Sequence, residues 1–103
     1  MLNKKYNVII SDRAAHMLVN HVKFLAQVSP NAANKLRKQI MDGAHRLAQM
    51  PERYPWLCCD EIPANKYRKM IVAGRYLLIY QIRDNNVFVD YIADCRQDYS
   101  WLI

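Results

Sequence analysis

The order of apolar and polar residues changes along the chain, and these changes mark the expected elements. Residues 6–11 (YNVIIS) are rich in β-branched side chains and alternate loosely, which predicts a short strand. Ser11 then offers a hydroxyl that can cap a helix, and Asp12 places a negative charge in its first turn. The apolar residues that follow lie at the spacing of one helix face: Met17, Leu18, Val22, Leu25 and Val28.

A second helix is predicted directly after the first. Ser29 can cap it, and Pro30 suits its first position, where a backbone N–H would have no partner. Pro51 is expected to end this helix, and Gly43 either weakens it slightly or lets another element approach closely. Its buried stripe consists of Ala33, Leu36, Ile40, Ala44 and Leu47. Two helices joined by so short a turn should pack as an antiparallel hairpin.

Beyond residue 51 the pattern becomes that of strands, after an irregular connector with three prolines and a short extended piece expected at 56–59. Residues 66–72, 75–82 and 87–93 have the composition of strands, with turn residues between them. The middle segment is apolar on both faces, which predicts a place inside the sheet. We therefore predict one α+β domain over residues 1–103. Its order is β-α-α-β-β-β, with the helical hairpin packed on one face of a mainly antiparallel sheet and the other face left open for function.

The composition fits a single domain and narrows the class of protein. The chain has 103 residues, of which 52% are hydrophobic and two are glycine, so one compact core is expected and a disordered chain is not. No apolar run approaches the ~18–20 residues of a membrane helix, and the N-terminus is interpreted as a strand and not a signal peptide. The cysteines, Cys58, Cys59 and Cys95, are odd in number and form no Cys-x-x-Cys motif. This pattern predicts reduced thiols in a cytoplasmic protein, with no metal, cofactor or membrane partner.

The net charge of +6 makes a polyanion or an acidic protein a natural partner, although charge alone does not decide between them. The basic residues gather around the expected sheet: Lys66, Arg68, Lys69, Arg75 and Arg96. Strand alternation places the first two of these on one face of their strand and the third on the other. Tyrosines interleave with the cations, as suits nucleic acid, because phosphates pair with cations and bases stack on rings. Tyrosines in strands are also ordinary packing residues, so both interpretations stay open.

Arg96 and Tyr99 form the more specific pair, because they follow the last strand, where the sheet edge opens onto solvent. A guanidinium matches a phosphate with two hydrogen bonds, and a phenol can position a phosphate oxygen or share in proton transfer. Asp98 could instead pair with Arg96 and make the cluster a structural cap. No Gly-rich phosphate loop or Gly-x-Ser-x-Gly motif is present.

Residues 66–99, KYRKMIVAGRYLLIYQIRDNNVFVDYIADCRQDY, resemble the C-terminal half of RelE/ParE superfamily toxins from bacterial toxin–antitoxin modules. The segment LAQMPERYP, where the helical hairpin ends, fits the same superfamily. The resemblance covers nearly the whole chain. It implies a RelE/ParE-like fold, a role of the kind linked to plasmid stabilization, and a cognate antitoxin as partner.

For members like RelE, the resemblance implies an endoribonuclease that cuts mRNA on the ribosome, where a 2′-hydroxyl attacks the neighbouring phosphate. The central-strand arginine of these nucleases would fall at Leu77, and Arg75, expected on the same strand face, would replace it. The implied catalytic residues are Arg96, Tyr99 and Arg75, and the implied RNA-binding residues are Lys66, Arg68 and Lys69. Fixed cations aimed at the phosphate would stabilise the charge that grows in the transition state.

Two alternatives stand beside this preferred hypothesis. Members like ParE poison DNA gyrase and need no catalytic apparatus, and a relic of such a toxin would only bind an antitoxin. The apolar end of the chain, Trp101, Leu102 and Ile103, is expected either to pack on the core or to contact a second copy in a homodimer.

Overall fold

The computed structural model describes residues 5–58 and 63–95. Its elements are β1 (Asn7–Ile10), α1 (Asp12–Ala26), α2 (Pro30–Arg46), the 3₁₀ turn η1 (Pro51–Arg53), β2 (Arg68–Val72), β3 (Tyr76–Arg83) and β4 (Asn86–Asp94). The predictions for Cys59, Arg96, Asp98, Tyr99, Trp101, Leu102 and Ile103 fall outside the described residues.

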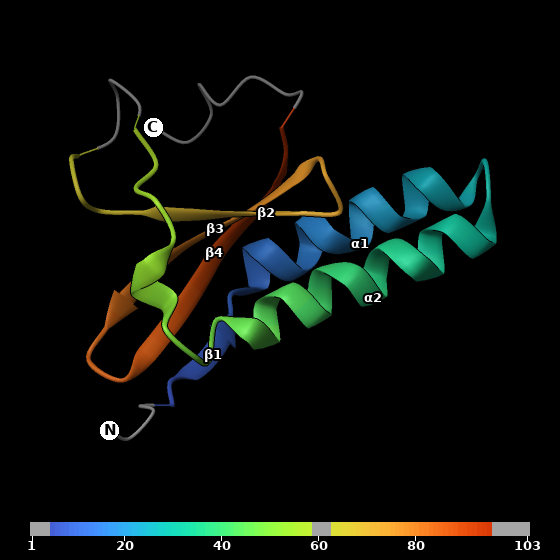
Figure 1. Ribbon diagram of the computed structural model, residues 1–103. Helices are drawn as coiled ribbons and strands as arrows, with labels where there is room; N and C mark the ends of the chain where they lie inside the picture. The colour runs from blue at the N-terminus through green and yellow to red at the C-terminus, as the bar shows by residue number, and fades with distance from the viewer. Residues whose placement is uncertain (1–4, 59–62, 96–103) are drawn as a thin grey trace.

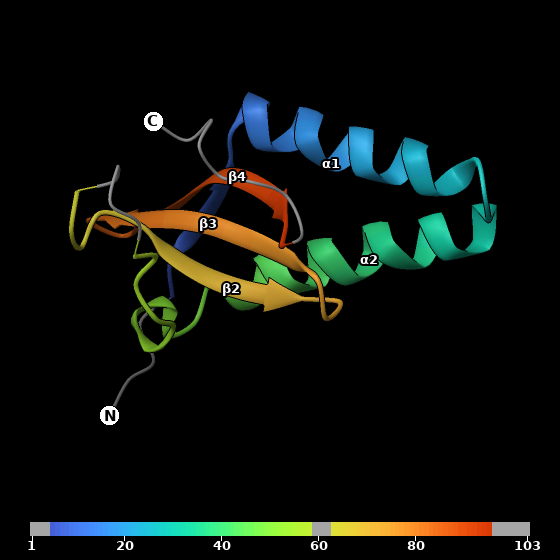
Figure 2. The ribbon, with the colours of Figure 1, turned by 90° about the horizontal axis from the view of Figure 1, so that it is seen from above.

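The four strands form one sheet in the order β1-β4-β3-β2. β1 runs parallel to β4, and the other two pairings are antiparallel. The helices lie side by side on one face of the sheet, and their connecting end extends beyond it (Figures 1 and 2). The predicted α+β order and the inner position of β3 are therefore confirmed. In the described part of the chain, neither helix has the length and hydropathy needed to cross a membrane.

Local signals set the beginnings of both helices. The Ser11 hydroxyl accepts a hydrogen bond from the Ala14 N–H at 3.0 Å, and the Ser29 hydroxyl accepts one from the Ala32 N–H at 3.2 Å. The end of α2 at Arg46 comes before the predicted stop at Pro51. After Arg46 the chain tightens into a turn, in which the Ala48 and Gln49 N–H groups donate to the His45 and Arg46 carbonyls at 3.1 and 3.2 Å. The Ala48 carbonyl then accepts a hydrogen bond at 2.8 Å from the Tyr6 N–H, beside β1.

The main core lies between the helices and the sheet. Its fully buried side chains include Ile40, Leu47, Leu78, Tyr80, Val87, Val89 and Ile92. Gly43 lets α2 approach β2, because a Cβ at this position would lie 2.5 Å from Val72 Cγ1. The close approach, one of the two roles expected for Gly43, is thus the one that the structure shows. The buried Tyr80 hydroxyl ties the core to η1, because it donates to the Pro51 carbonyl at 2.7 Å.

The opposite face of the sheet carries a second, smaller apolar cluster. It consists of Leu57, Leu77, Ile79, Tyr91 and Ala93. The connector covers it, because the Leu57 N–H donates to the Tyr67 carbonyl at 2.7 Å and residues 55–57 run along the edge of β2. This face was expected to remain open for function, and the structure shows that it is partly filled instead.

Candidate functional site

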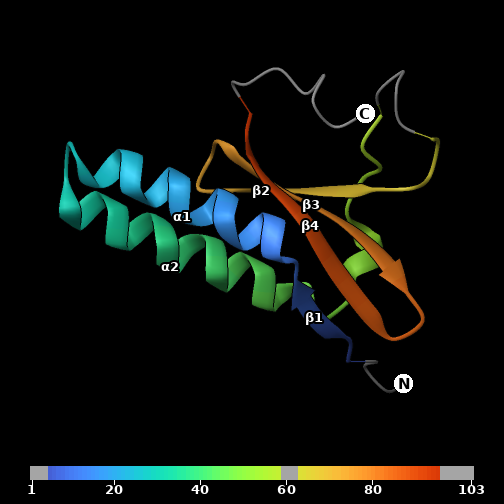
Figure 3. The ribbon, with the colours of Figure 1, turned by 180° about the vertical axis from the view of Figure 1, so that it is seen from behind.

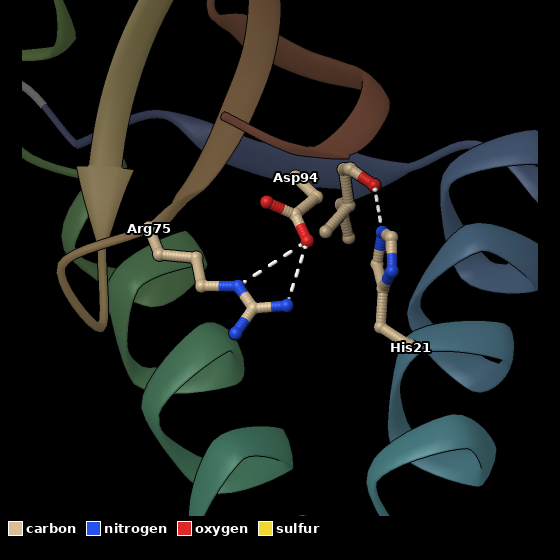
Figure 4. Close-up of polar contacts among 4 residues, drawn as sticks. His21, Arg75 and Asp94 are labelled. Carbon is tan, nitrogen blue, oxygen red and sulfur yellow. Dashed lines mark hydrogen bonds and ion pairs between the residues drawn. The ribbon is translucent and has the colours of Figure 1, made fainter. Parts of the chain in front are cut away.

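The predicted site surrounds the end of β4, where the chain leads to Arg96. Arg75 lies in the turn before β3, and Asp94 is the last residue of β4. The Arg75 guanidinium donates to Asp94 Oδ2 from Nε at 3.2 Å and from Nη2 at 2.9 Å (Figure 4). The Asp94 side chain is only 9% exposed, while that of Arg75 is 38% exposed. The hydrogen bonds that Arg75 donates to Asp94 raise the pKa of Arg75, so this cation keeps its proton.

Helix α1 forms the other wall of this site. His21 Nε2 lies 2.8 Å from the Ile92 carbonyl oxygen, which can only accept, so Nε2 carries the proton (Figure 4). The His21 ring lies 5.1 Å from the ring of Tyr76. A groove of about 740 Å³ opens here, lined by Met17, Asn20, His21, Phe24, Arg75, Tyr76 and Asp94. We call it the corner groove.

The expectation that Arg75 projects from the same face as Leu77 is wrong. Ala73 and Gly74 have positive φ values of 53° and 72°, so the chain turns there and strand alternation does not extend back to Arg75. Arg75 pairs with Asp94 on the side of α1, whereas Leu77 packs with Leu57 on the other side of the sheet. Arg75 therefore does not reach the place where an arginine at position 77 would lie.

The three cations of the first predicted meander strand do not converge on one site. Arg68 Nη1 donates to the carbonyls of Glu52 and Tyr54 at 2.9 and 2.7 Å, and its guanidinium lies 3.8 Å from the centre of the Trp56 ring. Lys66 is exposed, with its ammonium 5.4 Å from the centre of the neighbouring Tyr67 ring.

Lys69 is half-buried and pairs with Ile79 of the second apolar cluster, whereas Arg68 pairs with Tyr80 of the main core, so the two lie on opposite faces, as alternation predicted. The RNA-binding role of the three cations stays a prediction. Arg68 has a structural task in any case, because its hydrogen bonds and ring contact fasten the connector to the sheet.

A polar cluster on the second face escaped the sequence analysis. The pairing of β3 with β4 shifts by one residue at Asp90, which forms a bulge. Asp90 Oδ2 accepts hydrogen bonds from the Tyr67 hydroxyl at 3.2 Å and from Gln81 Nε2 at 2.7 Å. Arg13 donates to the Tyr91 hydroxyl and lies 4.7 Å from the centre of that ring. The one sign of this cluster in the sequence was the carboxylate of Asp90, within the otherwise apolar strand predicted over residues 87–93.

Ionisation of the Tyr67 phenol should make the stability of the protein depend on pH at high pH. Burial, followed by the charge of Asp90, raises its pKa from the ordinary 10.0 to about 12. Because the folded state favours the protonated phenol, its contribution to stability is complete below pH 10 and is lost as the pH rises through 12. We expect the thermal midpoint to fall more steeply over this interval in the wild type than in Tyr67→Phe. Identical pH dependence in the two proteins would contradict the assignment.

The architecture has a clear counterpart among solved structures. A chain in the structure of the chromosomal ParDE TA system from P. aeruginosa superposes with a TM-score of 0.72 at 14% identity. The match covers 88% of this chain and 97% of that chain. A search of curated proteins found no match. The β-α-α-β-β-β order and the superposition define a fold of the RelE/ParE class, as the sequence indicated.

A comparison of the sequence with protein-family models identifies the family within this class. The model described as ParE toxin of type II toxin-antitoxin system, parDE, matches residues 8–99, which is most of the chain. The chain belongs to this ParE toxin family.

Proposed function

We propose that this toxin acts by inhibiting DNA gyrase and that it does not cleave mRNA. The match to the ParE family model over residues 8–99 is the observation that carries the proposal. Of the three hypotheses drawn from the sequence, the match favours the gyrase inhibitor over the mRNA endoribonuclease, which came first there.

The contacts of Arg75 and Arg68, two of the cations predicted for the nuclease site, support the same choice. An RNA-cleaving site needs charges free to face the phosphate as it becomes more negative. Leu77, at the position of the nuclease arginine, is 6% exposed within an apolar cluster. The guanidinium of Arg75 is paired with Asp94, and that of Arg68 is bound to two backbone carbonyls. An inhibitor that binds a protein target needs a complementary surface and no such cations.

Gyrase and mRNA assays on the same protein separate the two activities. We expect the purified chain to inhibit supercoiling of relaxed plasmid by gyrase, and brief induction in cells to activate DNA damage signalling. Mapping of transcript 5′ ends after induction should show no new cuts within translated codons. Cuts clustered in codons, together with unaffected supercoiling, would overturn the proposal.

Tyr99→Phe and Arg96→Ala sharpen this comparison. The R-x-D-Y tail is the observation that favours the nuclease, and its two residues remain sequence-based predictions. A nuclease that uses the Tyr99 phenol in proton transfer would lose about 10²–10⁴-fold in cleavage rate in Tyr99→Phe. A gyrase inhibitor that does no chemistry with this hydroxyl should keep its effect on supercoiling. Arg96→Ala should likewise relieve growth arrest only if the cell is poisoned through mRNA cleavage.

The cognate antitoxin is proposed to be an acidic or amphipathic segment that orders on binding to the basic surface. The corner groove is a suitable place, because it combines the exposed ring of Phe24 with the polar groups around Asp94. Phe24 is 70% exposed, and Val28, near the protruding end of the hairpin, is 80% exposed. Such apolar exposure is typical of a surface that a partner covers.

A further inference from the structure

Basic side chains from three separate segments converge at the end of the sheet opposite Asp94. Lys5 precedes β1, His45 and Arg46 belong to the last turn of α2, and Arg53 ends η1. These three segments lie near one another in Figures 1 and 3. The pocket between them has a volume of about 400 Å³ and is lined by Lys5, His45, Arg46, Ala48, Gln49, Met50 and Arg53. We call it the cationic pocket.

Backbone contacts hold the walls of the cationic pocket in place. Lys5 and Gln49 form an antiparallel bridge, and the next residue, Tyr6, donates its N–H to the Ala48 carbonyl at 2.8 Å. The Arg53 N–H donates to the Met50 carbonyl at 3.2 Å, which closes η1. The basic side chains therefore project from a fixed frame, which lowers the conformational cost of binding a ligand.

Met50 adds an independent sign of a site. It has φ 50° and ψ 50°, the left-handed conformation, although it is neither Gly nor Asn. Pro51 follows it, and a proline disfavours helical conformations in the preceding residue. The Met50 side chain is nevertheless 60% exposed, so burial of an apolar group does not account for this conformation. Strained residues of this kind gather at functional sites.

Among the residues that the structure describes, no negatively charged one lines the cationic pocket beside its basic side chains. None of the lining residues is acidic, and none of the four basic side chains forms an ion pair with a carboxylate of residues 5–58 or 63–95. Helix α2 partly explains His45 and Arg46, because cations suit the last turn of a helix. The helix end does not explain why Lys5 and Arg53, which belong to other segments, lie beside His45 and Arg46.

The two nearest acidic positions in the sequence, Asp42 and Glu52, do not line the cationic pocket. Asp42 lies one turn before Arg46 on α2 and is exposed, and the Glu52 carboxylate accepts a hydrogen bond from the Tyr6 hydroxyl. Like charges held together repel one another, and a bound anion would relieve this repulsion.

We propose that the cationic pocket binds phosphate groups of a nucleic-acid strand. The Arg46 guanidinium can hold a phosphate with two hydrogen bonds, and the Lys5 ammonium adds a further charge. Arg53 Nη2 donates to the Tyr54 hydroxyl at 3.0 Å, and the other N–H groups of this guanidinium can still donate to a phosphate. A nucleic-acid strand carries one charge per nucleotide at close spacing, so neighbouring phosphates can engage several of these groups together. A single acidic side chain brings one charge. This site is separate from the corner groove and does not depend on which target the toxin inhibits.

Two charge-matched double variants test the proposal by fluorescence anisotropy with a short labelled DNA duplex. Arg46→Gln with Arg53→Gln removes two charges of the pocket. Arg37→Gln with Lys38→Gln removes two charges from an exposed part of α2 that does not line it. The pocket pair should weaken DNA binding about tenfold or more and lower the slope of log K against log salt by about 2, since each lost phosphate contact accounts for about 0.9. The control pair should change the affinity much less.

Three results would overturn the assignment. They are no binding of the duplex by the wild type, equal weakening in the two double variants, and pocket-dependent binding of poly-glutamate that is tighter than that of DNA. The last would assign the pocket to an acidic protein segment. Titration of the wild type with inorganic pyrophosphate, followed by amide NMR, gives a test without any substitution. Shifts centred on residues 45–50 and 53 support the proposal, and unshifted signals there contradict it.

Discussion

Tyr80→Ala is expected to lower the free energy of unfolding by about 3–5 kcal/mol, the usual cost of truncating a buried aromatic residue. The Tyr80 ring is 0% exposed, and it lies in the core between the helices and the sheet. Burial raises the pKa of its hydroxyl above the usual 10.0, because the charged phenolate would be poorly solvated there. A loss of this size is a large fraction of the stability of a small domain, about 5–15 kcal/mol.

Tyr80→Phe separates the hydrogen bond from the packing. It keeps the ring but leaves the Pro51 carbonyl without the bond that it accepts at 2.7 Å, at an expected cost of about 1–3 kcal/mol. Denaturant unfolding followed by circular dichroism measures both variants. Tyr54→Phe is the matched control, because the half-buried Tyr54 hydroxyl bonds to an exposed arginine, and a change within about 0.5 kcal/mol is expected. Equal losses in the two Phe variants would show that the Pro51 contact contributes nothing particular.

Gly43→Ala is the second substitution with a large expected effect. Alanine is the better helix former by about 1 kcal/mol, so on an exposed helix face the change would stabilise the protein. Here the new methyl group would lie 2.5 Å from Val72 Cγ1, and Val72 is a stiff β-branched residue of β2. We expect a net loss of about 1–3 kcal/mol from overpacking.

Val72→Ala provides the internal test of this explanation. Alone it should destabilise by opening a cavity, but together with Gly43→Ala it removes the atom that clashes. The two substitutions should therefore be coupled by about 0.5–3 kcal/mol in a double-mutant cycle, with the double variant more stable than the sum predicts. Gln39→Ala, on an exposed part of α2, should be neutral or slightly stabilising. If the effects of Gly43→Ala and Val72→Ala were strictly additive, the clash with Val72 could not be the cause of the destabilisation.

The elements that the sequence predicted well depend on local chemistry. The hydroxyl caps at Ser11 and Ser29, the helical stripes and the apolar β3 act within a few residues, so their signals can be read directly. The end of α2 could not be read in this way, because the turn that follows it is bonded to Tyr6, about forty residues earlier in the chain.

The site was harder to predict for the same reason. Period-two alternation placed Lys69 correctly, but it failed at Arg75, where two positive φ values turn the chain before β3 begins. Asp90 was missed because a one-residue shift in strand pairing leaves no mark in the pattern of apolar residues. In each case the deciding contact joins residues far apart in the sequence, such as Tyr67 with Asp90.

The parallel pairing of β1 with β4 has a consequence for synthesis of the toxin. Asn7 is hydrogen-bonded to Asn86, a separation of 79 positions, so the sheet cannot close until β4 has been synthesised. A ribosome that stalls before β4 leaves α1 and α2 without the strands that cover them. Completion of the fold therefore waits for the synthesis of β4, and such long-range closure is slow compared with helix formation.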